Sequence, residues 1–281
     1  MELITSLAKR RGFVYPGSEI YGGLAGAWDY GPLGVLLKNN IKNLWWKKFV
    51  LQRDDIYGID SSILMNTKVW EASGHLQGFQ DLLRECKKCH KRFRADHLDK
   101  DKCPECEGEL TKARRFNTMF KTFIGPVEDS ASVIYLRPET AQGMFVNFKN
   151  IVDSFHPKIP FGMAQTGKAF RNEITSANFI FRSREFEQME IEYFIKEKEW
   201  EKWFDYWLSQ MREWIESIGI NKNMVSEREV PEDERAHYSK RTVDIYYDFP
   251  FGKDELYGIA YRTDFDLKNH GLDYIDEGTK E

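Results

Sequence analysis

Acidic and basic side chains that could do chemistry gather between Phe161 and Ile195 of this 281-residue chain. Both ends of that stretch alternate as strands do and its middle is polar, which predicts a long hairpin. A face with two carboxylates is costly to bury unless it lines a site that holds cations or hydrogen-bond donors, so the hairpin is a candidate ligand site. On the second strand the polar face carries Gln188, Glu190 and Glu192, and the apolar face carries Met189, Ile191, Tyr193 and Ile195.

Arginines near the polar face extend this candidate site. Arg171 follows the first strand, and Arg182 and Arg184 stand at the far end of the loop. Guanidinium groups beside a carboxylate-lined face suit a ligand with anionic and ammonium ends, such as a nucleoside triphosphate together with an amino acid. An ordinary amphipathic hairpin with solvated charges is the alternative.

The spacing of these residues resembles the second signature motif of class II aminoacyl-tRNA synthetases: Phe-Arg-x-Glu at 170–173, a loop, then Arg182-x-x-x-Phe186-x-x-x-Glu190. The words RPETAQG (137–143), GKAFRNEI (167–174) and REFEQMEIEYF (184–194) are similar to those of glycyl-tRNA synthetases of the single-chain homodimeric type. The resemblance runs from about Arg11 to the C-terminus. It implies an α+β class II catalytic fold, an antiparallel sheet flanked by helices, with an inserted zinc ribbon.

The same resemblance implies ATP-dependent ligation of glycine to tRNA(Gly) through a glycyl-adenylate, with Arg171 as the catalytic residue. The implied ATP-binding residues, expected to act with Mg²⁺, are Arg171, Asn172, Glu173, Phe181, Arg182, Ser183, Arg184, Glu185, Phe186, Glu255 and Leu256. The implied glycine-binding residues are Arg94, Glu139, Phe186, Glu187, Gln188, Met189 and Glu190. Two other functions stay open: a non-catalytic protein that binds tRNA or a small ligand, and an adenylate-forming paralogue with a different acceptor.

All four cysteines stand in two C-x-x-C knuckles, Cys86 with Cys89 and Cys103 with Cys106. Thiolates at this spacing converge on one tetrahedral zinc ion with no open position, which predicts a structural site. Disulfides are the alternative, and they fit poorly with a reducing compartment. The segment 84–115 carries 11 Lys and Arg against 7 Asp and Glu, which suits tRNA phosphates. A small module with a solvated charged surface explains the excess equally well.

Other segments predict the scaffold. A helix is expected from Pro32 to about Leu51, and the resemblance places it at a dimer interface, although its apolar stripe suits a core as well. A second helix is expected over 197–218, with an aromatic stripe packed on the apolar back of the sheet. A buried strand at 133–136 leads to Glu139, where a helix N-cap is the alternative to a ligand role. The glycine-rich stretch 12–34 predicts turns more than a phosphate loop.

Composition and length bound these expectations. No apolar run reaches the roughly 20 residues that span a bilayer, and the first residues lack a signal-peptide pattern, so a cytoplasmic protein is expected. We expect a catalytic part at 1–83, the zinc ribbon at 84–115 and the catalytic core at 116–281. The third family motif and the anticodon-binding domain are missing from the sequence, so it resembles the N-terminal part of the enzyme, and its activity alone is an open question.

Overall fold

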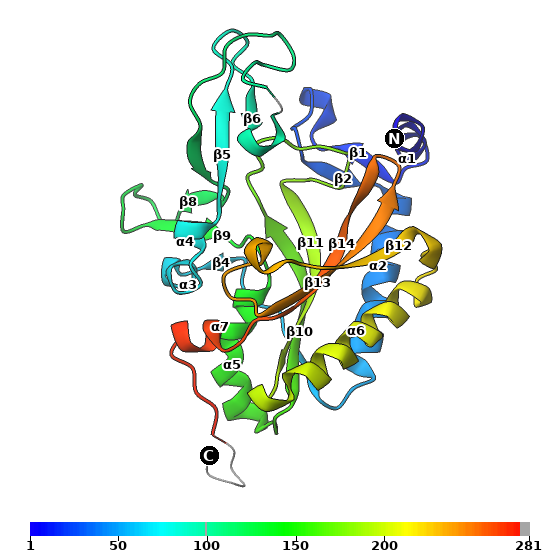
Figure 1. Ribbon diagram of the computed structural model, residues 1–281, viewed down its shortest axis with the longest axis vertical. Helices are drawn as coiled ribbons and strands as arrows, with labels where there is room; N and C mark the ends of the chain where they lie inside the picture. Colours follow the sequence, from blue (N-terminus) through cyan, green and yellow to red (C-terminus); the bar gives the residue numbers. More distant parts are fainter. Residues whose placement is uncertain (99, 276–281) are drawn as a thin grey trace.

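The long hairpin lies at the centre of the computed structural model, which describes residues 1–98 and 100–275 (Figure 1). Strands β10 (Phe161–Phe170) and β11 (Glu185–Phe194) pair antiparallel along their whole length, as predicted. Strand β3 (Ile56–Gly58) extends this sheet on the other side of β10, where it runs parallel. Gly167 of β10 lets the guanidinium of Arg137 lie against the backbone, because a Cβ there would overlap it.

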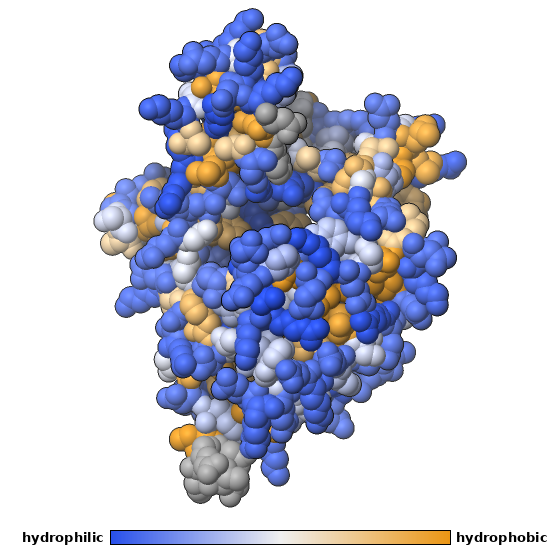
Figure 2. All heavy atoms as spheres, viewed as in Figure 1, coloured by the Kyte–Doolittle hydropathy of each residue, from blue (hydrophilic) through white to orange (hydrophobic). Residues whose placement is uncertain are grey.

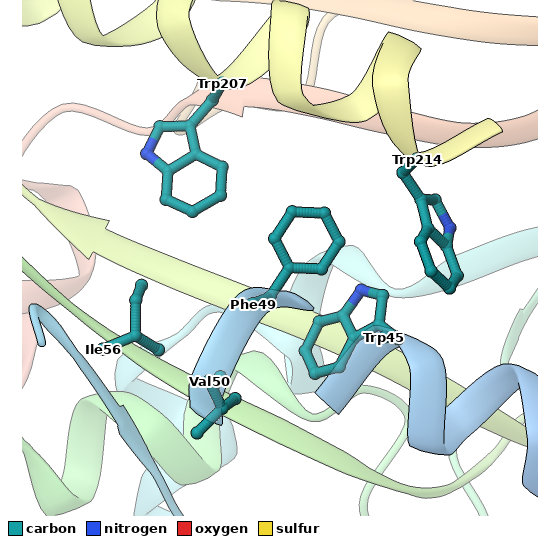
Figure 3. Close-up of a cluster of buried hydrophobic side chains, with 7 residues drawn as sticks. Trp45, Phe49, Val50, Ile56, Trp207 and Trp214 are labelled. Atoms are coloured by element: carbon teal, nitrogen blue, oxygen red, sulfur yellow. The ribbon is translucent and has the colours of Figure 1, made fainter. Parts of the chain in front are cut away.

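Helices cover both faces of the hairpin (Figure 1). Helix α2 (Pro32–Trp46), which continues as the π-helix η2 (Lys47–Leu51), packs with α6 (Trp200–Ser217) on one face. Helix α5 (Ala141–Phe155) packs on the other face. Figure 3 shows aromatic rings of α2, η2 and α6 directed toward one another. The cluster consists of Trp45, Phe49, Val50, Ile56, Ala164, Trp207 and Trp214, with Met189, Ile191 and Tyr193 of β11 packed against it.

The predicted apolar face of β11 and the predicted aromatic stripe of the second helix are therefore confirmed, and they meet each other. Burial of apolar surface at about 25 cal/mol per Å² makes such a cluster the main stabiliser of this half of the molecule. Since the apolar face is fixed against α6, the strand's alternation turns Gln188, Glu190 and Glu192 to the opposite side. The register of the hairpin thus determines which face of the sheet carries the polar side chains of the candidate site.

A second antiparallel sheet consists of β12 (Val225–Glu229), β13 (Arg241–Phe249) and β14 (Gly252–Tyr261), and it packs on α6. The register of β13 with β14 shifts after Ile245, which leaves Leu256 as an extra residue. All strand pairs except β3 with β10 are antiparallel among the residues that the structure describes, in agreement with the predicted fold class.

The remaining elements frame the site. The segment before α2 forms α1 (Glu2–Arg10), β1 (Val14–Pro16), η1 (Glu19–Tyr21) and β2 (Trp28–Tyr30). Gly17, Gly22, Gly23 and Gly26 lie between the two strands of this short hairpin, in agreement with the predicted turns, whereas Gly34 lies inside α2. Two small sheets are β4 (Leu64–Met65), β9 (Val133–Leu136), β8 (Lys121–Phe123), and β6 (Arg92–Arg94), β5 (Gln80–Glu85), β7 (Arg114–Asn117). Short helices are α3 (Thr67–Ala72), α4 (His75–Gly78), α7 (Phe265–Asn269), η3 (Ala95–His97), η4 (Glu197–Glu199), η5 (Lys222–Met224) and η6 (Glu232–Glu234).

No helix in the described part of the chain is both long and apolar enough to cross a bilayer.

Candidate active site

Three carboxyl groups on the α5 side of the hairpin lie close enough to shift one another's pKa values, and we call this cluster the carboxylate recess. Glu139 stands between β9 and α5, and Glu190 and Glu192 project from β11. Thr140 links the two elements: its hydroxyl donates to Glu190, and its backbone N–H donates to the Gln188 amide oxygen at 3.2 Å. Thr140 is the N-cap residue of α5, yet its side chain makes no capping hydrogen bond. The Thr140 side chain therefore does not cap the helix, because its hydroxyl bonds Glu190 instead.

The pKa values of these carboxyl groups diverge. Partial burial alone would raise the pKa of Glu139, but hydrogen bonds from His75 and Gln142 and the charge of Arg262 outweigh it and lower the pKa to about 2. Partial burial raises the pKa of Glu190, and the neighbouring Glu139 carboxylate raises it further. Opposed shifts of this kind mark sites where charge is arranged for a ligand. A recess with three carboxyl groups around the Arg262 cation suits a ligand that brings an ammonium group.

Arg262 is a site residue that the sequence predictions missed. Its Nε donates to the Asp266 carboxylate at 2.9 Å, and its guanidinium lies 3.7 Å from the ring centre of Tyr238. Burial alone would lower the pKa of Arg262, but Glu192, Glu139 and other neighbours hold it well above the usual value. The only sequence signal was an arginine directly after a strand, beside the predicted Glu255 and Leu256.

Arg171 stands at the end of β10, directed toward the polar recess and away from the apolar layer. Its Nε donates to the carbonyl of Pro138 at 3.1 Å, next to Glu139 in the chain. Its guanidinium lies between the rings of Phe79 and Phe186, 5.4 and 5.3 Å from their centres. The positive charge of Arg171 also lowers the pKa of Glu190. Arg171 forms no ion pair with any described carboxylate, so its charge is available to a ligand.

A cavity of about 400 Å³ opens beside Arg171. Figure 2 shows it as a hollow between the β5–β6–β7 lobe and the body of the molecule. Several predicted nucleotide-site residues meet there, and their guanidinium groups suit a polyphosphate, while Phe181 and Phe186 offer apolar surface to a base. The lining includes the predicted ATP-binding residues Arg171, Glu173, Phe181, Arg182, Ser183 and Phe186, together with Phe79, Asp81 and Thr118. Arg94, predicted as a glycine-binding residue, also lines this cavity.

Other predicted residues of the hairpin point away from this cavity. Glu187 lies between Lys38 and Lys42 of α2, at 2.8 and 2.7 Å, and Met189 packs in the core. The strand's alternation is the reason, because both residues have the parity of the apolar face. Glu185 pairs with Lys168 at the exposed end of the hairpin.

The remaining predicted residues contribute through backbone or through position. Asn172 donates its backbone N–H to the Thr118 carbonyl at 2.7 Å. The Arg184 side chain donates to the carbonyls of Ala25 and Glu173. Desolvation raises the pKa of Glu255, and Asp244 raises it further, whereas the charge of Arg171 lowers it, so Glu255 and Arg171 are electrostatic neighbours. Leu256 is the extra residue of a β-bulge, a feature common beside active sites.

The four cysteines converge at the tip of the β5–β6–β7 lobe, as predicted. Their sulfur atoms all lie within 4.8 Å of one another, with Cys86 and Cys106 at 3.5 Å and Cys89 and Cys103 at 3.7 Å. Four sulfurs placed about 2.3 Å from a central zinc ion would be about 3.8 Å apart, so the cluster fits this metal. All four are free thiols, which contradicts the disulfide alternative.

Comparison with known proteins agrees with this geometry. Residues 122–279 match the family model for the tRNA synthetase class II core domain (G, H, P, S and T). Two solved structures of prolyl-tRNA synthetase from Cryptosporidium parvum superpose on this chain with TM-scores of 0.64 and 0.67, each at 14% sequence identity. Each superposition covers 98% of this chain, and they cover 47% and 46% of the respective synthetase chains. At that identity the likeness concerns the fold. The fold, the carboxylate recess and the arginine cavity thus define the catalytic core of a class II aminoacyl-tRNA synthetase.

The sequence comparison is more specific. The chain is 54% identical to the glycine–tRNA ligase of Treponema denticola, over 99% of this chain and 64% of that protein. It is 52% identical to the glycine–tRNA ligase of Geobacillus thermodenitrificans, over 100% of this chain and 68% of that protein. The chain belongs to the glycine–tRNA ligase family and spans about two thirds of the length of these relatives.

Proposed function

We propose that this chain carries the glycine-activating site of a glycine–tRNA ligase. The observation that carries the proposal is the position of Arg171, an arginine without an ion-pair partner among the described residues, between the carboxylate recess and the cavity. A glycine ammonium group in the recess would leave its carboxylate directed at Arg171. ATP in the cavity would bring its α-phosphate to the same guanidinium.

In the proposed reaction, a glycine carboxylate oxygen attacks the α-phosphorus of ATP. The bond from that phosphorus to pyrophosphate breaks, and glycyl-adenylate forms. The fork of Arg171 holds one carboxylate oxygen and one non-bridging phosphate oxygen, and so aligns the reactants and stabilises the charge that develops on phosphorus. The terminal ribose hydroxyl of tRNA(Gly) then attacks the glycyl carbonyl, and AMP leaves. No step needs a side-chain nucleophile.

Metal ions have separate roles in this proposal. Glu173 and Glu255 offer the carboxylate oxygens that Mg²⁺ prefers, near the expected place of the phosphates. Mg²⁺ would neutralise phosphate charge. Zinc in the four-cysteine cluster would be structural, because four thiolates leave no open coordination position.

Glycine-dependent exchange of radioactive pyrophosphate into ATP tests the activation step. We expect exchange with glycine and at least about tenfold less with alanine, because one added methyl group changes binding by about 1–3 kcal/mol even in a roomy pocket. Absence of exchange would favour the non-catalytic alternative. Adding tRNA and detecting an acid-labile glycyl ester separates the ligase from an adenylate-forming paralogue.

A homodimer is the second part of the proposal, supported by the exposed face of α2. The predicted stripe divides: Trp45 is buried, whereas Leu33, Leu37 and Leu44 are 45%, 53% and 50% exposed. Leu36, which is 58% exposed, borders this apolar face. A continuous apolar face on one helix suits a second copy of the chain. Sedimentation analysis of the chain and of Leu37→Glu tests this part.

Contact with tRNA through the β5–β6–β7 lobe is the third part, and its support is weaker. Several basic side chains there pair with acidic ones of the same lobe, such as Lys87 with Glu109 and Arg84 with Asp101. These pairs leave less charge for phosphates than the sequence count suggests. We also propose a cytoplasmic location, which the four free thiols support.

A further inference from the structure

His75, to which the sequence motifs assign no chemistry, contacts the ammonium-site carboxylate directly. It begins helix α4 and is 9% exposed. Its Nε2 lies 3.3 Å from the Glu139 Oε2. The other oxygen of Glu139 accepts from the Gln142 amide at 3.2 Å. Each oxygen of this carboxylate therefore has a donor within the protein, which fixes the rotation of the group before a ligand arrives.

The surroundings of His75 fix the ring as well. Its Nδ1 lies 2.8 Å from the hydroxyl of Ser73, which is buried. The ring packs between Trp70 and Phe79, with centre distances of 5.5 and 5.3 Å. The guanidinium of Arg171 in turn lies 5.4 Å from the ring centre of Phe79. One short segment, residues 70–79, thus supports both the ammonium site and the catalytic arginine.

Two hydrogen-bond arrangements are open to His75. The Ser73 hydroxyl donates either to Nδ1, which leaves the proton on Nε2, or to the Trp70 carbonyl at 3.5 Å, in which case it accepts from Nδ1. The Glu139 carboxylate, 3.3 Å from Nε2, favours the arrangement with the proton on Nε2. This arrangement orients the carboxylate and leaves its full negative charge for an ammonium group. The opposite tautomer would direct a lone pair at the carboxylate and repel it.

We propose that His75 is a positioning residue for amino-acid binding: its Nε2–H holds Glu139 in the orientation that receives the glycine ammonium group. This inference rests on the proposed function for the identity of the ligand, but the His75–Glu139 hydrogen bond itself does not. Contacts of this kind, one step behind the binding group, typically change affinity tenfold or more when they are removed.

Two substitutions at the same position separate positioning from packing. In His75→Gln the amide nitrogen takes the place of Nε2 and can still donate to Glu139. In His75→Asn the amide nitrogen takes the place of Nδ1, and the side chain is too short to reach Glu139. We expect His75→Asn to raise the KM for glycine about tenfold in pyrophosphate exchange, with the KM for ATP and kcat unchanged, and His75→Gln to stay within about twofold of the parent. Equal KM values for glycine in the two variants, or an equal rise in the KM for ATP, overturn the proposal.

A spectroscopic measurement on the same 281-residue chain decides the matter independently of activity. Long-range ¹H–¹⁵N spectra should show the His75 ring, assigned by its loss in His75→Asn, with the proton on Nε2 and a signal that moves in Glu139→Gln. A proton on Nδ1, or a signal that Glu139→Gln leaves in place, overturns the hydrogen bond. If the parent chain lacks glycine-dependent exchange but shows the expected spectrum, the proposed function fails while the positioning role of His75 stands.

Discussion

The two ends of the candidate site are built differently. At the amino-acid end, Glu139 accepts from His75 and Gln142, and Arg262 is paired with Asp266. At the nucleotide end, the Arg171 side chain donates to one carbonyl and lies near two aromatic rings. The charged groups at the amino-acid end are thus held in place by partners within the protein. At the nucleotide end, the charge of Arg171 is not paired with any described carboxylate.

The chemistry of the two proposed ligands explains this difference. Glycine has no side chain to grip, so a protein can select it only by a rigid wall and an exactly oriented ammonium site. A fixed carboxylate lowers the entropy lost on binding such a small ligand. ATP brings several negative charges of its own, and Arg171, which has no ion-pair partner among the described residues, can turn to meet them. We therefore expect changes at the nucleotide end to affect the chemical step, and changes at the amino-acid end to affect glycine binding.

Arg171→Ala tests the nucleotide end and should have the largest effect. We expect pyrophosphate exchange to fall at least about 10³-fold, because the only group that can bridge both reactants is gone. Arg171→Lys should recover little, since an ammonium group lacks the fork. Arg212→Ala on α6, an exposed arginine paired with Glu227, is the matched control and should leave the rate unchanged. Near-normal exchange in Arg171→Ala would refute the assignment.

Glu139→Gln tests the amino-acid end. The variant keeps the size of the side chain but removes the charge that faces the ammonium group, so the KM for glycine should rise about 100-fold. The KM for ATP should stay within about twofold. Glu201→Gln, at an exposed position of α6, serves as the control. If the KM for ATP rises as much as that for glycine, the two ends are not separate.

Removal of zinc tests whether the β5–β6–β7 lobe serves only the nucleotide end. Arg94 lies in this lobe and also lines the cavity, whereas the carboxylate recess receives no residue from it. Treatment with a zinc chelator that spares Mg²⁺ should raise the KM for ATP about tenfold and leave thermal unfolding of the main body unchanged. Restored ATP affinity on adding zinc is the control. A loss of glycine affinity alone would contradict this division.

The sequence predicted the central hairpin, its two faces and the cysteine cluster, because each has a strong local pattern. The pairing of Glu139 with Glu190 came from the resemblance to the synthetase family. Arg262 has no such pattern. Its neighbours Asp266, Tyr238 and Glu192 lie in α7, before β13 and in β11, and only the folded chain brings them together. Local sequence cannot supply contacts of that kind.

A contiguous sequence motif can also include residues whose side chains do not face the site. The word from Phe186 to Glu190 resembles a glycine-binding segment as a whole, yet its residues alternate between the two faces of β11. Glu187 turns to α2 and Met189 to the core, while Gln188 and Glu190 turn to the recess. Strand periodicity therefore refines a motif match residue by residue.

Glu192 allows the finest test of the amino-acid end, through stability. Partial burial raises the pKa of Glu192 well above the ordinary value of 4.5, and Glu190 and Asp266 add to the rise although Arg262 opposes it. Above pH 4.5 the folded chain therefore keeps a proton that the unfolded chain has lost. The folded state binds more protons, so the contribution of Glu192 to the free energy of unfolding falls as pH rises from 4.5 toward the raised pKa.

Glu192→Gln removes this proton uptake. The variant should match the parent chain near pH 4 and become more stable than the parent by about 1 kcal/mol as the pH approaches 7, in urea unfolding at a series of pH values. Glu201→Gln should give a curve parallel to that of the parent, since its side chain is exposed. Parallel curves for Glu192→Gln and the parent would mean that Glu192 is already ionised against Arg262, and that the amino-acid end holds one more fixed negative charge than its geometry suggests.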